Sequence, residues 1–90
     1  MTRNIIKVIR TLYENEGEEG LKFRELKNLA NIHHTDDFAF ILMFLLDINF
    51  VKCVVRDKNK YYYIINRTCP LIQKIKQGIY NLDRLEPKDL

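Results

Sequence analysis

Apolar residues recur along this chain at two different spacings, and the change falls near residue 50. Before that point they stand three or four positions apart, which is typical of one face of a helix. Beyond it, "FVKCVVR" and "YYYIIN" are rich in β-branched and aromatic residues, which is typical of strands. The two longest helical faces consist of Ile5, Val8, Ile9, Leu12, Phe38, Ile41, Leu42 and Leu45.

The first half of the chain is predicted to hold three helices. The first begins at Thr2 or Asn4 and ends in "ENEGEEG", where glycines interrupt the pattern. A short extended piece over 21–23 leads into a two-turn helix in "RELKNLANI". After the turn "HHT", Thr35 is a good N-cap for a third helix that runs to about Ile48. The two acids that follow this cap suit the positive end of the helix dipole.

The second half is predicted to hold a hairpin and a last helix. "DKNK" joins the two strands, and Asn59 is suited to a positive φ angle in that turn. If Lys58-Asn59 is the turn centre, Cys53 faces Ile64 across the two strands. Cys69-Pro70 opens a helix over 69–85, because proline is tolerated in a first helical turn. The order of elements predicts a single α+β domain over residues 1–90.

Three stretches carry a resemblance to a known family. "IIKVIRTLYENEG" reads as a first helix, "LKFRELKNLANI" as a short strand with a second helix, and "LLDINFVKCVVRDKNKYYYI" as a third helix running into a hairpin. This pattern resembles the winged helix-turn-helix domain of small archaeal and bacterial regulators of the multiple-antibiotic-resistance-repressor type. Asn49 stands where these regulators usually have glycine, and both residues tolerate positive φ. The resemblance implies a homodimeric transcriptional regulator that binds double-stranded DNA.

Charge is unevenly distributed along the chain. The net charge of +3 is mild, but residues 52–76 hold seven basic residues against one acid. A hairpin, or wing, with this charge can lie along a phosphate backbone, where contacts set affinity without reading sequence. The alternative is a solvated edge hairpin whose lysines resist strand pairing. The predicted DNA contacts are Lys52, Arg56, Lys58, Lys60, Arg24, Lys27 and Thr35, with the hydroxyls of Tyr61, Tyr62 and Tyr63 as further candidates.

The third helix does not have the composition of a DNA-reading helix. Its outward face is predicted to hold Asp36, Phe40, Met43, Phe44 and Asp47, with no lysine or arginine. Reading helices of the resembled family carry polar or basic side chains there, which bond base edges. Three partners can cover this face: the chain itself, a second subunit, or another protein. The alternative function is therefore a winged-helix module that docks a protein partner through its third helix.

The last predicted helix has a stripe of its own. Ile72, Ile75, Ile79 and Leu82 follow 3-4-3 spacing, which can pair with a copy of the same helix. Gly78 lies within this stripe, where it costs helix stability and suggests a close approach of two backbones. The stripe predicts part of a dimer interface, and packing onto the chain's own first helix is the alternative.

No residue pattern points to an enzyme, a cofactor or a metal site. The chain has no serine, and neither Cys53 nor Cys69 has an evident partnering histidine for nucleophilic catalysis. Adjacent His33 and His34 diverge, whereas metal ligands must converge on one point. The two cysteines form no disulfide framework and are expected to be reduced thiols.

Membrane insertion is not expected either. The longest apolar run, residues 38–46, is far shorter than the roughly 20 residues that span a bilayer. The first ten residues lack the apolar core of a signal peptide. We therefore expect a cytoplasmic protein.

Overall fold

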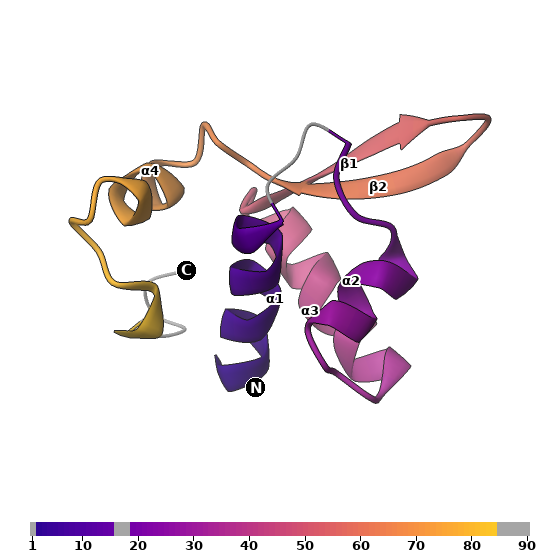
Figure 1. Ribbon diagram of the computed structural model, residues 1–90, viewed down its shortest axis with the longest axis horizontal. Helices are drawn as coiled ribbons and strands as arrows, with labels where there is room; N and C mark the ends of the chain where they lie inside the picture. The colour runs from indigo at the N-terminus through magenta and orange to yellow at the C-terminus, as the bar shows by residue number, and fades with distance from the viewer. Residues whose placement is uncertain (1, 16–18, 85–90) are drawn as a thin grey trace.

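The computed structural model describes residues 2–15 and 19–84. They form four α-helices and one two-stranded antiparallel sheet, an α+β arrangement compatible with a winged helix (Figure 1). The middle of the predicted first loop and the predicted end of the last helix, residue 85, lie outside these ranges. The elements are α1 (Thr2–Glu14), α2 (Phe23–Leu29), α3 (Thr35–Asp47), β1 (Val51–Arg56), β2 (Lys60–Ile65), α4 (Pro70–Lys76) and a 3₁₀ turn, η1 (Leu82–Arg84).

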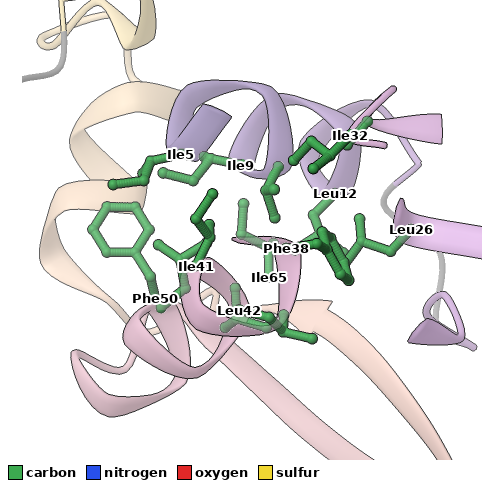
Figure 2. Packing of buried hydrophobic residues seen from close by; sticks show 14 of the residues in the cluster. Ile5, Ile9, Leu12, Leu26, Ile32, Phe38, Ile41, Leu42, Phe50 and Ile65 are labelled. Atoms are coloured by element: carbon green, nitrogen blue, oxygen red, sulfur yellow. The ribbon is translucent and has the colours of Figure 1, made fainter. Parts of the chain in front are cut away.

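Buried side chains of α1 and α3 form the centre of the molecule, and α2 packs against them (Figure 2). The predicted apolar faces of α1 and α3 are both buried, which confirms that prediction. The rings of Phe23 and Phe38 meet edge to face with centroids 4.8 Å apart, an arrangement that aromatic pairs favour. The other elements add Leu26, Ala30, Ile32, Phe50, Val51, Ile65 and Ile72 to this core.

The two ends of α3 differ in how well the sequence predicted them. The N-cap is His34, in extended conformation, so Thr35 is already the first helical residue and the prediction of a Thr35 cap is wrong. At the other end Asn49 has φ +62°. A positive φ was predicted there because Asn49 stands where the resembled regulators usually have glycine. The amide of Phe50 donates to the carbonyl of Leu45 across this turn, at 3.0 Å, and the chain enters β1 at once.

The hairpin has a three-residue loop in which Asp57, Lys58 and Asn59 all have positive φ. Asn59 was predicted in this conformation, but the other two residues were not. The loop sets a register in which Cys53 pairs with Tyr63, so the predicted pairing of Cys53 with Ile64 is wrong by one residue. A two-residue turn centre places a different pair opposite each other from a three-residue loop, which explains the error.

Leu21 forms an isolated antiparallel bridge with Tyr63 at the free edge of β2. Its amide donates to the carbonyl of Tyr63 at 3.0 Å, and the amide of Tyr63 donates back at 2.8 Å. Gly20 consequently lies against Ile64, where an added Cβ would come within 2.6 Å of a side-chain methyl and 2.8 Å of a backbone oxygen. Since Gly20 also has φ +77°, both space and backbone conformation require glycine there.

The last helix is shorter than predicted. α4 ends at Lys76 because Gly78 takes φ +77°, and the amides of Gly78 and Ile79 bond back to carbonyls of the last turn. The prediction of a helix over 69–85 is therefore wrong within the described residues, and so is the continuous stripe that it would carry. Ile72 is fully buried, Ile75 and Leu82 are half-buried, and Ile79 is 69% exposed.

The segment that follows α4 turns back towards α1. Asp83 of η1 forms an ion pair with Arg10, and both side chains are well exposed, so the pair stabilises the fold little. In Figure 1, α4 and η1 lie on one side of α1, while α2 and α3 lie on the other. The C-terminal segment is thus packed on the chain's own first helix, the alternative to a dimer seam that the sequence left open.

Substitutions at Gly20 and Gly78 test the contact beneath the wing. Gly78→Ala should lower the free energy of unfolding by about 1–2 kcal/mol, because residue 78 has a positive φ. An added Cβ would meet no neighbour there, so no steric cost is added. Gly20→Ala should cost about 1–3 kcal/mol more, because it must also displace Ile64 or the backbone of Tyr63. Urea unfolding followed by circular dichroism measures both. Equal losses would show that the contact at Gly20 relaxes freely.

Candidate nucleic-acid interface

The register of the wing gathers basic side chains on one face. Residues that pair across antiparallel strands point to the same side, and successive residues alternate. One side of the wing therefore holds the pairs Lys52–Ile64, Val54–Tyr62 and Arg56–Lys60, and the pairing of Leu21 with Tyr63 places Lys22 beside Tyr62. We call this side the basic face; its cations are Lys22, Lys52, Arg56 and Lys60.

Tyr62 lies at the centre of the basic face. Its ring centroid is 5.8 Å from Nζ of Lys22 and 5.9 Å from Cζ of Arg56. Each such cation–π contact stabilises an exposed side chain by about 0.5–1 kcal/mol. The ring therefore holds two cations from different segments close to each other, against the repulsion between their charges.

Two acids border the basic face. The hydroxyl of Tyr62 donates to the carboxylate of Asp57 at 3.2 Å, at the loop end of the wing. Glu25 accepts a hydrogen bond from the backbone amide of Lys22 at 3.1 Å, which fixes the start of α2. Asp57 is thus bonded to the ring hydroxyl and Glu25 to the backbone. With four cations and two acids, the basic face and its border are net positive.

The opposite side of the wing is apolar. It begins at the buried pair Val51–Ile65 and continues through Cys53–Tyr63 to the exposed pair Val55–Tyr61. Burial raises the pKa of the Tyr63 hydroxyl above its usual range, and the neighbouring Cys53 thiol adds to this effect. Tyr61 and Tyr63 belong to this apolar side. Of the three tyrosines predicted as phosphate contacts, only Tyr62 lies on the basic face.

The remaining predicted DNA contacts are not part of the basic face. Lys58 is exposed in the hairpin loop, Arg24 and Lys27 belong to α2, and Thr35 is the exposed first residue of α3. Lys22, in contrast, was not among the residues predicted at the site. The extended piece "LKF" was the available signal, but only the long-range pairing of Leu21 brings Lys22 to the wing.

The outward side of α3 is uncovered within the described chain. Phe40 is 60% exposed and Met43 is 64% exposed, so neither is a core residue of this fold. Phe44 is half-buried against the core at the flank of the buried stripe, so it is less outward than predicted. We call Asp36, Phe40, Met43 and Asp47, which follow one another at helical spacing, the acidic–apolar stripe.

No family model, curated protein or solved structure matches this chain. The winged-helix resemblance therefore stays a prediction, and any function has to be inferred from the residues of this chain. Among residues 2–15 and 19–84, no three His, Cys, Asp or Glu side chains gather in a way that could hold a metal ion. None of the helices in these ranges is long and apolar enough to cross a membrane.

Exposure of Phe40 can be tested through stability. Phe40→Glu should change the free energy of unfolding by less than about 0.5 kcal/mol, because the ring is mostly in solvent. The control Phe38→Ala, two positions away in the core, should cost about 3–5 kcal/mol. Thermal unfolding of both variants gives the comparison. A large loss in Phe40→Glu would mean that this ring is covered in solution.

Proposed function

We propose that this chain is a winged-helix domain that binds double-stranded DNA mainly through phosphate contacts of its wing. The carrying observation is the basic face, in which the strand register and the Leu21 bridge bring Lys22, Lys52, Arg56 and Lys60 to one side. Lysine and arginine on a projecting hairpin are suited to a phosphate backbone because each can neutralise one phosphate and release its counterion.

The order of elements supports the winged-helix part of this proposal. α2, a tight turn and α3 follow one another as a helix-turn-helix, and a hairpin comes directly after α3. The isolated bridge at Leu21 stands where the resembled domain has a short strand before its second helix. In Figure 1 the hairpin projects beyond the helices, as a wing must do to reach a duplex.

The composition of α3 limits what such binding can read. No lysine or arginine occurs in residues 28–51, and the exposed acids of α3 are Asp36, Asp37 and Asp47. A carboxylate about 4 Å from a phosphate is repelled by about 1 kcal/mol in bulk water. We therefore infer that the DNA contacts come from the wing, that they depend strongly on salt, and that they discriminate little between sequences.

Homodimerisation and transcriptional regulation enter this proposal from the resemblance alone. The predicted dimer stripe does not lie on one helix, because α4 ends before Gly78. Of its residues Ile79 remains well exposed, whereas Ile72 belongs to the chain's own core. A dimer of this chain would consequently not use the continuous helical stripe predicted over residues 72–82.

The salt dependence of duplex binding tests the role of the wing. If the four cations of the basic face each neutralise one phosphate, a plot of log affinity against log salt should have a slope of about −3 to −4. Lys52→Glu/Lys60→Glu should make this slope shallower by about 2, because two phosphate contacts are lost. Fluorescence anisotropy of a labelled duplex at several salt concentrations measures both values.

A matched control separates local contacts from net charge. Arg3→Glu/Lys74→Glu changes the net charge equally, at exposed positions of α1 and α4. It should weaken binding only through the overall field and leave the slope close to that of the wild type. Absence of binding at low salt, or equal effects of the two double variants, would rule out the wing as the contact surface.

A further inference from the structure

We propose that the acidic–apolar stripe of α3 docks a basic amphipathic helix of a partner protein. The stripe is a separate surface from the basic face and lies on a different element, so this inference does not rest on DNA binding. Phe40 and Met43 are its apolar centre, and exposed acids stand at both ends. Large apolar side chains flanked by charge in this way are typical of protein interaction sites.

The apolar centre has a hollow beside it. A shallow pocket of about 510 Å³ lies between the start of α1 and the first turns of α3, lined by Asn4, Asp36, Asp37, Phe40 and Ile41. Its mixed lining can receive a long side chain with an apolar stem and a charged end, because the stem packs on Phe40 while the end reaches the carboxylates. Lysine and arginine are the side chains of that kind.

The charges specify the partner further. Asp36 and Asp47 are separated by about three helical turns, or about 16 Å along the axis. α3 has no basic residue of its own that could neutralise them. A partner helix that packs along α3 would therefore match the stripe with two apolar residues at its centre and a lysine or arginine near each end.

A second copy of this chain matches the stripe poorly. In a two-fold dimer through α3, the two stripes would run either antiparallel, with Asp36 of one copy facing Asp47 of the other, or parallel, with each acid facing its counterpart. Both contacts join like charges, and no basic residue of α3 relieves them. A contact between the stripe of one copy and the basic face of another would relieve the charges, and the solution mass of the chain tests for it.

The test uses the full chain and a synthetic helical peptide with two central leucines and lysines three turns apart. Backbone amide shifts should change along α3 and at the start of α1 when the peptide is added. A peptide with glutamates in place of the lysines should bind at least about tenfold more weakly. Phe40→Glu should lower the affinity for the lysine peptide at least about tenfold. The control Ile79→Glu, at another exposed apolar position, should leave this affinity unchanged.

Charge reversal provides the second arm. Asp36→Lys/Asp47→Lys should favour the glutamate peptide, whereas Lys52→Glu/Lys60→Glu should leave peptide binding intact even where it removes DNA binding. Absence of lysine-peptide binding, equal binding of both peptides, or shifts centred on the wing would overturn the proposal. A wild-type solution mass of two chains that Phe40→Glu returns to one would overturn it too, since the stripe would then be occupied by a second copy.

Discussion

Two backbone hydrogen bonds between Leu21 and Tyr63 connect the helical half of the molecule to the wing. They cover one edge of β2, place Lys22 against the ring of Tyr62, and bring Gly20 so close to Ile64 that no side chain fits. Without this bridge the basic face would have cations from the hairpin alone. This bridge therefore places a cation from the start of α2 on the surface of the wing.

The helical core and the strands were predictable because each repeats a simple period. The apolar residues of α1 and α3 face one another as their spacing indicates, and β-branched and aromatic residues form the hairpin. Such patterns are local and depend on burial of one face, so a single sequence is enough to read them.

The errors arose where one residue decides the geometry. Gly78 could extend a stripe or end a helix, and its positive φ ends α4. The hairpin register depended on whether Asp57 adopts positive φ, which is uncommon for a residue other than glycine. The contribution of Lys22 depended on a pairing between residues 21 and 63, and such long-range contacts leave no periodic signal in the sequence. The spacing of Phe40 and Met43 places them on the outward face of the helix but does not say what covers that face. The packed structure shows that nothing in the described chain does.

The outer edge of β2 is bridged by Leu21, whereas that of β1 is not, and this difference affects aggregation of the folded chain. β1 pairs with β2 on one side and, within residues 19–84, with no strand on the other, so its outer edge offers unpaired backbone groups. Exposed edges of this kind can recruit strands from other molecules and begin aggregation, and charged side chains oppose that pairing. Lys52 and Arg56 stand on this strand. Their charge therefore opposes strand pairing between copies, whether or not the wing binds DNA. Substitutions that keep a charge at these two positions preserve solubility better than apolar ones.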